Sequence, residues 1–492
     1  MGKVYIICWS IFLLTGCEYA DAGNPFQKKI KQQTALQEFQ TFRTILRSSH
    51  PSLNLYVTDK KLNHLLDSLQ KTITAEVMVG ELFSKYNFIT NEIGCSHTYL
   101  GMPAETYDSL LNRSFFFPLP VKLIENKLLV NVAGNELVQG TEIIAINERP
   151  VSEILGQVAK YESVEGLHRK TQSKLAVESL AINYFYAYGK QTSFKLAIKD
   201  TLGLERQVTL EPITLNEWYS RRDEKIYYYD RDECDYDLYI NENRQYALLR
   251  VATFSYDGVE KQTAFENFCK NAFELLYHKK NIPSLIIDLR ENTGGDLYNS
   301  SLLFSYLCKE PFKEYEKAET KIRYIKQAGY LTSSFSLNKK ETVNLKLTTD
   351  FSRTSSAGFY KMEDSLIGRW TPDKYSFKGN IYVITNSRVT SAASYFSVMV
   401  KNSGVGKVVG EETSGGNYSG NGFTNLRYTL PYSKIELVFP YCHLVYTYKE
   451  KQNRGTGLVP DFEIADTYSS FRNNEDRQLM FIRDSLLRKN SN

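Results

Sequence analysis

Residues 381–401 read IYVITNSRVTSAASYFSVMVK, and this stretch predicts a buried strand, a tight turn and a helix in succession. The strand, residues 381–385, is rich in Ile, Val and Tyr, and polar residues follow it. We expect the helix to run from about Ser391 to Lys401. A serine there has its hydroxyl beside the free N–H groups of the first helical turn, which favours a nucleophile. Serine is also an ordinary helix N-cap, so the pattern alone leaves both interpretations open.

Other segments predict the same layered arrangement. Residues 284–289, SLIIDL, form an apolar run typical of a strand buried on both faces of a parallel sheet. Residues 265–276 predict a helix, and residues 408–410, VVG, predict another short strand. This alternation from about residue 215 indicates an α/β core. Residues 310–378 show little periodicity and predict an insertion with some β-structure.

The turn after the 284–289 strand carries two glycines. Residues 288–295 read DLRENTGG, so Gly294 and Gly295 come just after a buried strand. Without a Cβ, their N–H groups can approach a ligand closely and can stabilise a developing oxyanion. Such turns are common in α/β proteins, so this segment alone indicates no activity.

A serine nucleophile needs a base, and the chain has six histidines. One of them, His97, directly follows Ser96 in the stretch GCSHTY, residues 94–99. A lone histidine is more often structural than catalytic, yet imidazole is the commonest general base for a serine hydroxyl.

Together these three segments resemble the peptidases that include the bacterial tail-specific (C-terminal processing) proteases and tricorn protease. The resemblance extends to residues 408–416, VVGEETSGG, and to the closing GLVPD of residues 457–461. It implies a serine endopeptidase that hydrolyses extended or unfolded polypeptides. Ser391 is the implied nucleophile, His97 the base, and Ser96 the residue that orients the imidazole. The implied oxyanion hole is built from the N–H groups of Ala392 and of Gly294 or Gly295.

The family has two catalytic styles. Tail-specific proteases use a Ser/Lys dyad, with the lysine just after the V-V-G-E-x-T-x-G run. That position is Gly416 here, while Lys401 and Lys407 come too early in the sequence. The sequence therefore favours the tricorn-like branch, which uses a histidine preceded by serine.

The tricorn-like relay ends in a glutamate shortly before the closing motif. Glu450 is the implied relay carboxylate, although residues 451–456 match the family pattern poorly. The position after Ala393 often holds Glu in this family and is Ser394 here. We do not expect that departure to abolish catalysis.

The N-terminus predicts export and lipidation. Lys3 precedes an apolar run, Val4 to Leu14, which is too short to span a membrane and suits a signal peptide. The run ends in Leu-Thr-Gly-Cys17, which matches a bacterial lipobox. We expect acyl chains on Cys17 to anchor the protein to a membrane of the cell envelope, on the periplasmic or cell-surface side. An ordinary secretory signal with a chance cysteine is the alternative.

The order of these features predicts four parts. They are a lipoprotein signal peptide (1–17), a helical domain (18–112), a PDZ-like domain (113–212) and an α/β peptidase core of the ClpP/crotonase type (213–492). Residues 140–151, GTEIIAINERPV, resemble the central strand and turn of a PDZ domain, which binds extended peptide ends at an open sheet edge. Its carboxylate-binding loop is not clear, so a β-rich insertion without a peptide role stays open. In the helical domain, Thr58 and Thr74 are expected to cap helices.

Composition excludes several functions. A net charge of +4 over 492 residues, without a basic stripe, argues against nucleic-acid binding. The seven cysteines form no C-x-x-C pair and there is no phosphate-binding glycine loop, so we expect no metal and no cofactor.

The fold does not guarantee hydrolysis. The retinoid-binding protein of the retina resembles these peptidases and serves as a carrier. A catalytically silent lipoprotein that binds peptides or hydrophobic ligands is therefore the alternative, and an envelope adaptor acting through the PDZ-like module is a third hypothesis. The presence of both Ser391 and His97 favours the enzyme. A homo-oligomer stays possible under each hypothesis.

Overall fold

The computed structural model describes most of the chain between residues 25 and 487. The described segments are 25–102, 104–131, 137–223, 235–243, 245–279, 281–332, 337–353, 358–449 and 455–487. Cys17, the predicted lipidation site, and Glu450, the predicted relay carboxylate, lie outside them. Within these segments, every helix is too short or too polar to cross a lipid bilayer.

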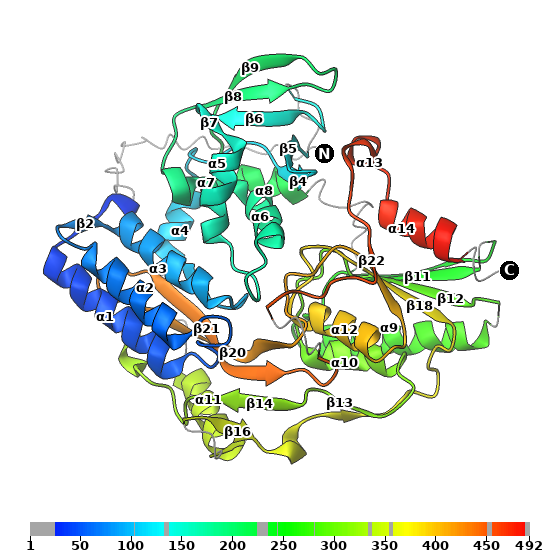
Figure 1. Ribbon diagram of the computed structural model, residues 1–492. Helices are drawn as coiled ribbons and strands as arrows, with labels where there is room; N and C mark the ends of the chain where they lie inside the picture. Colours follow the sequence, from blue (N-terminus) through cyan, green and yellow to red (C-terminus); the bar gives the residue numbers. More distant parts are fainter. Residues whose placement is uncertain are drawn as a thin grey trace, which may run out of the picture.

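A six-stranded sheet forms the centre of the α/β core (Figure 1). In spatial order its strands are β10 (Tyr236–Asn241), β11 (Tyr246–Val251), β12 (Ser284–Asp288), β18 (Asn380–Thr385), β19 (Lys407–Gly410) and β22 (Phe462–Glu463). The strands from β11 to β22 are parallel, and β10 is antiparallel at one edge. Every residue of β12 is buried, as its continuous apolar run predicts. The Gly-rich turn with Gly294 and the turn before Ser391 follow β12 and β18, at the carboxyl ends of neighbouring parallel strands.

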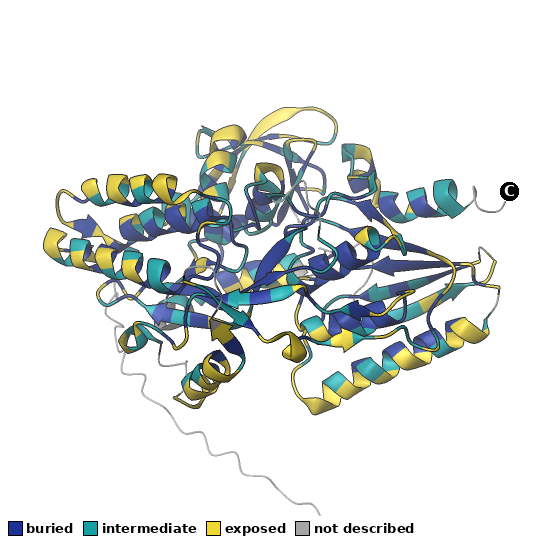
Figure 2. Ribbon diagram, turned by 60° about the horizontal axis from the view of Figure 1, so that its bottom comes forward, coloured by how far each residue is buried: buried dark blue, intermediate teal, exposed yellow. Residues whose placement is uncertain are grey.

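Helices cover both faces of this sheet, and buried residues dominate its inner strands, which are mostly dark blue in Figure 2. One face packs against α9 (Val259–His278), α10 (Leu297–Ser305) and α12 (Ser391–Asn402). The other face packs against the C-terminal segment around α14 (Arg477–Phe481) and Ile482. The predicted strand, turn and helix of residues 381–401 are confirmed, since β18 ends at Thr385 and α12 begins at Ser391.

A second sheet joins the α/β core to the helical region. Its strands are β15 (Phe351–Arg353), β16 (Tyr360–Met362), β14 (Lys317–Thr320), β21 (Glu436–Val445) and β20 (Ser419–Thr429), with β3 (Tyr99–Gly101) beside β21. The predicted insertion at residues 310–378 supplies three of these strands. It also holds α11 (Leu337–Thr349) and the two-stranded pair β13 (Phe312–Lys313) and β17 (Arg369–Trp370).

Three N-terminal helices pack against the second sheet and share one hydrophobic core with it. They are α1 (Gln32–Ser49), α2 (Asp59–Lys71) and α3 (Val79–Ile93). The predicted cap of α2 is confirmed, because the Thr58 hydroxyl accepts a hydrogen bond from the N–H of Lys61 (3.2 Å). The predicted cap at Thr74 is wrong. The chain instead forms β2 (Val77–Met78), which pairs with β1 (Lys29–Ile30), and α3 begins only after that strand.

The β-rich module has a five-stranded antiparallel sheet with β7 (Arg149–Pro150) at its side. Its strands are β4 (Val121–Ile124), β5 (Lys127–Val130), β6 (Glu142–Ile146), β8 (Phe194–Lys199) and β9 (Glu205–Leu210). Helices α5 (Val151–Val158), α6 (Arg169–Glu178) and α7 (Leu180–Tyr188) close its core. The predicted strand and turn of residues 140–151 correspond to β6, a turn with positive φ at Asn147 and Glu148, and β7.

Elements on either side of this module also pack onto it. The helices α4 (Ala104–Leu111) and α8 (Leu215–Asp223) share a small core with α7 around the buried Trp218. Phe471 of the C-terminal helix α13 (Tyr468–Asn473) packs against Ile124. The domain boundaries after residues 112 and 212 stay predictions, but the module is clearly embedded among its neighbours.

Candidate active site

Ser391 stands on a sharp turn between β18 and α12. Its φ of +50° lies in the left-handed region, which is uncommon for a residue with a side chain and often marks a functional position. The turn leaves no room for a side chain on the facing loop. A Cβ on Gly294 would lie 2.6 Å from the Cβ of Ser391 and 3.0 Å from the backbone N of Ala392. Glycine at position 294 therefore allows the two catalytic turns to meet.

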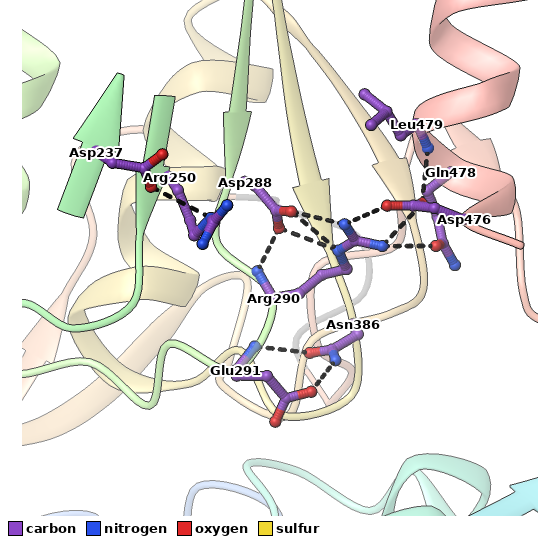
Figure 3. A network of polar contacts seen from close by, with 9 residues as sticks. All are labelled: Asp237, Arg250, Asp288, Arg290, Glu291, Asn386, Asp476, Gln478 and Leu479. Atoms are coloured by element: carbon purple, nitrogen blue, oxygen red, sulfur yellow. Dashed lines mark hydrogen bonds and ion pairs between the residues drawn. The ribbon is translucent and has the colours of Figure 1, made fainter. Parts of the chain in front are cut away.

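The two turns are also joined by side chains, which Figure 3 draws. The Nδ2 amide of Asn386 donates to the Glu291 carboxylate (2.8 Å). Arg290, the arginine of the DLRENTGG segment, is buried and donates to Asp288 (2.6 Å) and to Asp476 before α14 (2.7 Å). This network fixes the Gly-rich turn between the sheet and the C-terminal helix.

His97 reaches Ser391 from the helical region, 294 residues earlier in the chain. Its Nε2 lies 3.1 Å from Oγ of Ser391. Helix α3 ends at Gly94, whose φ of +69° reverses the chain toward this site. A short turn follows, in which the Thr98 N–H donates to the Cys95 carbonyl (3.0 Å) and His50 holds the Thr98 hydroxyl (2.8 Å).

Ser96 and Glu165 continue the hydrogen-bonded series beyond the imidazole. Oγ of Ser96 lies 3.0 Å from Nδ1 of His97. The Ser96 hydroxyl donates to Oε2 of Glu165 (3.1 Å), and the Ser96 backbone N–H donates to the same oxygen (3.1 Å). Tyr56 donates to the other carboxylate oxygen (3.2 Å). Because the Ser96 hydroxyl donates its hydrogen to Glu165, its oxygen can only accept a hydrogen bond from Nδ1 of His97. We therefore assign the proton of the neutral imidazole to Nδ1, which leaves Nε2 free to accept from Ser391.

Glu165 comes from the β-rich module, in the loop between its helices α5 and α6. This loop is joined to the catalytic region by backbone bonds, from the Glu165 N–H to the Ser414 carbonyl (3.0 Å) and from the Gly166 N–H to the Gly94 carbonyl (2.7 Å). Sequence reasoning missed Glu165, since a single glutamate between Val164 and Gly166 carries no local pattern. Its contact with Ser96 depends on three distant segments that meet here, around Gly94, Glu165 and Ser414.

Gly416, at the position of the dyad lysine, borders Glu165. A Cβ on Gly416 would lie 2.8 Å from Cγ of Glu165 and 2.4 Å from the Ser419 carbonyl oxygen. The absence of a side chain at position 416 thus leaves room for the side chain of Glu165. The two nearby lysines are engaged elsewhere, Lys401 with the Val459 carbonyl (2.5 Å) and Lys407 with Asp461 (3.1 Å).

Burial sets the protonation states of His97 and Glu165. It lowers the pKa of His97 to about 4, so the imidazole is neutral at pH 7 and able to accept a proton. Burial raises the pKa of Glu165 to about 7, while the hydrogen bonds from Ser96 and Tyr56 oppose that rise. The carboxylate charge of Glu165 is therefore sensitive to pH near neutrality.

The predicted oxyanion donors lie around Ser391, and one of them is already engaged. The N–H of Gly294 donates to Oδ1 of Asn292 (2.9 Å). The N–H groups of Gly295 and of Ala392, at the start of α12, remain as the candidate pair. Gly295 lines the same cavity as Ser391 and His97, which measures about 540 Å³.

Cys95, His97 and Glu165 form a group with metal-ligand chemistry, since their donor atoms lie within 4.8 Å of one another. The hydroxyl of Ser96 already bonds both His97 and Glu165. The Sγ of Cys95 receives the Nδ2 amide of Asn421 (2.9 Å), and burial raises the pKa of this thiol to about 12, which disfavours the thiolate that a metal requires. The group thus fits a hydrogen-bonded relay better than a metal site.

Comparison with known proteins adds an independent observation. Residues 245–464 match the family model of peptidase family S41. No curated protein matches the sequence significantly. Mature CPAF complexed with lactacystin is similar over 93% of this chain and 97% of that one, with 15% identity and a TM-score of 0.62. A serine-to-alanine mutant of CPAF is similar over 93% and 96% of the two chains, with 14% identity and a TM-score of 0.63. At these identities the likeness shows the fold.

Proposed function

Because residues 245–464 match the family model of peptidase family S41, a family of serine-type peptidases, we propose that this chain is an endopeptidase that cleaves extended polypeptides at a bacterial cell envelope. The observation that carries the proposal is the hydrogen-bonded series from Ser391 through His97 and Ser96 to Glu165. It pairs a nucleophile with a neutral base, and it opens onto a cavity large enough for a substrate side chain.

The proposed reaction proceeds through an acyl-enzyme. Ser391 transfers its hydroxyl proton to Nε2 of His97 while Oγ attacks the scissile carbonyl carbon. The negative charge on the carbonyl oxygen is stabilised by the N–H groups of Gly295 and Ala392. The C–N bond then breaks, and His97 delivers its proton to the leaving amine. Water hydrolyses the ester on Ser391, with His97 taking the water proton and returning it to Oγ.

Ser96 and Glu165 act in this proposal as positioning residues. They hold the His97 ring with Nδ1 protonated, and the Glu165 charge stabilises the imidazolium that forms during attack. The resemblance to tricorn protease assigned this role to Glu450. The two hydrogen bonds from Ser96 to Glu165 support the assignment to Glu165 instead.

The envelope location rests on the N-terminal sequence. The apolar run from Val4 to Leu14 and the Leu-Thr-Gly-Cys17 motif support export and acylation at Cys17. Metabolic labelling with a radioactive fatty acid tests it in the producing bacterium. Label that is present in the wild type and absent in Cys17→Ala supports the anchor, and equal labelling of both contradicts it.

The test of the activity uses full chain purified in detergent. The wild type is expected to react with a fluorophosphonate probe and to cleave casein, whereas Ser391→Ala and His97→Ala lose about 10⁴-fold or more of the rate. Ser403→Ala, at the other end of α12, is the matched control and keeps full activity. Unchanged cleavage by Ser391→Ala would exclude this serine as the nucleophile. Peptide binding without labelling or cleavage in the wild type would favour the carrier hypothesis.

A further inference from the structure

The cavity beside Ser391 has walls from three parts of the chain. The start of α10 contributes Asp296 and Tyr298, and the segment between β13 and β14 contributes Glu314 and Tyr315. Strands β20 and β21 supply the rest, including Phe423. Since Ser391, His97 and Gly295 line the same cavity, a side chain next to the scissile bond can enter it.

The charges in this cavity have one sign. Asp296 and Glu314 are its two carboxylates, and among the described residues that line it none is Lys or Arg. Neighbouring cations are paired outside the cavity, Lys313 with Asp364 and Lys449 with Glu316. Within the part of the chain that the structure describes, neither Asp296 nor Glu314 takes part in an ion pair of 4 Å or less. A half-buried carboxylate without a cation is costly, so Glu314 gains from a cationic partner.

Glu314 is held in a fixed place relative to the nucleophile. Its N–H donates to the Gly368 carbonyl (2.9 Å), and its own carbonyl accepts the hydroxyl of Tyr395. Tyr395 belongs to α12, the helix that begins at Ser391. Burial raises the pKa of the Glu314 carboxyl and the nearby Asp296 charge adds to that rise, while hydrogen bonding to Ser301 and Trp370 opposes it. A positive charge in the cavity would oppose both effects.

Aromatic rings complete the walls. Tyr298 and Phe423 are 41% and 42% exposed, while Tyr315 and Tyr446 are almost fully buried. Rings of this kind pack against the aliphatic stem of Lys or Arg and attract its cationic end. Acidic groups and aromatic walls together are thus complementary to the long cationic side chains of Lys and Arg.

We propose that this cavity selects a Lys or Arg side chain next to the scissile bond, with Glu314 as the main specificity-determining residue and Asp296 as a weaker second charge. The proposal rests on the proposed peptidase function, whose substrate class it narrows. Neutral residues would leave Glu314 without a cation, and acidic residues would be repelled.

The test compares quenched fluorescent peptides that are identical except for Arg, Leu or Glu at one position next to the cleaved bond. Full-length wild type in detergent should cleave the Arg peptide with a kcat/KM about tenfold or more above the Leu peptide. Glu314→Gln should lose most of that ratio of kcat/KM between the Arg and Leu peptides. Glu316→Gln is the matched control, because this neighbouring glutamate is exposed and paired with Lys449 outside the cavity.

Binding separates this proposal from the peptidase proposal. Ser391→Ala should bind a fluorescently labelled Arg peptide more tightly than the Leu peptide, and the double variant with Glu314→Gln should not. Cleavage by the wild type without any preference for Arg or Lys would overturn the cavity assignment and leave the peptidase intact. A Glu314-dependent Arg preference in binding, without cleavage, would support the cavity and reject the peptidase.

Discussion

Glu165 and Glu314 both belong to the surroundings of Ser391, yet they are satisfied in different ways. Burial raises the pKa of each carboxyl. Glu165 receives three hydrogen bonds, from the backbone and hydroxyl of Ser96 and from Tyr56. Glu314 lines the cavity beside Ser391 without an ion-pair partner among the described residues. A raised pKa therefore does not define a role. The partners distinguish the two carboxyls, and on this basis we propose that Glu165 acts on His97 and that Glu314 acts on the substrate.

The sharpest way to test this comparison is to neutralise Glu165. Glu165→Gln keeps the size of the side chain but removes the charge that stabilises the His97 imidazolium, so kcat should fall about 10²-fold. The loss should be equal for Arg and Leu peptides and should leave KM nearly unchanged, which steady-state kinetics on both peptides measures. A loss confined to Arg peptides would mean that Glu165 contacts substrate and would break the comparison.

The pH profile tests the same assignment with a smaller effect. Because the pKa of Glu165 is raised to about 7, its stabilising charge is present above pH 7 and is lost as the pH falls. We expect kcat/KM to decline by about tenfold from pH 8 to pH 5.5. His97 does not cause this decline, since its pKa is lowered to about 4 and it stays neutral over that range.

The control for the pH profile is Glu162, in the same loop. Burial also raises the pKa of Glu162 to about 7, and the positive charge that opposes this rise is that of Arg388. Glu162→Gln should keep the acid decline, and Glu165→Gln should lose it. The same decline in all three proteins would assign it to another group.

The smallest expected effect concerns Asp296. This carboxylate is exposed and also caps α10 by accepting from the Tyr298 N–H (2.9 Å), a bond that Asn can replace. Asp296→Asn should reduce the preference for Arg over Leu by about two- to threefold, since solvent screens an exposed charge. Added salt should lower the preference of the wild type in the same direction. A larger loss in Asp296→Asn than in Glu314→Gln would reverse the ranking of the two acidic residues.

The β-rich module takes part in both the fold and the site. Its strand β6 and its turn at residues 147–148 correspond to the strand and turn that the sequence of residues 140–151 predicted. Glu165, which this module contributes to the candidate active site, follows no local sequence pattern. Glu165 reaches Ser96 because the loop before α6 is bonded to Gly94 and Ser414, which belong to two other parts of the chain.

Sequence alone determined the central strands, the Gly-rich turn, the Ser391 turn and the pairing of Ser96 with His97. These features are local, since apolar runs, glycines and helix starts depend on residues a few positions apart. It also misplaced the start of α3, because the pairing of Val77 with Ile30 is a contact between segments 47 residues apart. Only the tertiary structure decided that Glu165 bonds to Ser96 beside His97, that Gly416 leaves Glu165 space, and that Glu314 lines the cavity beside Ser391. Each of these depends on distant segments meeting, and packing between such segments leaves no periodic trace in the chain.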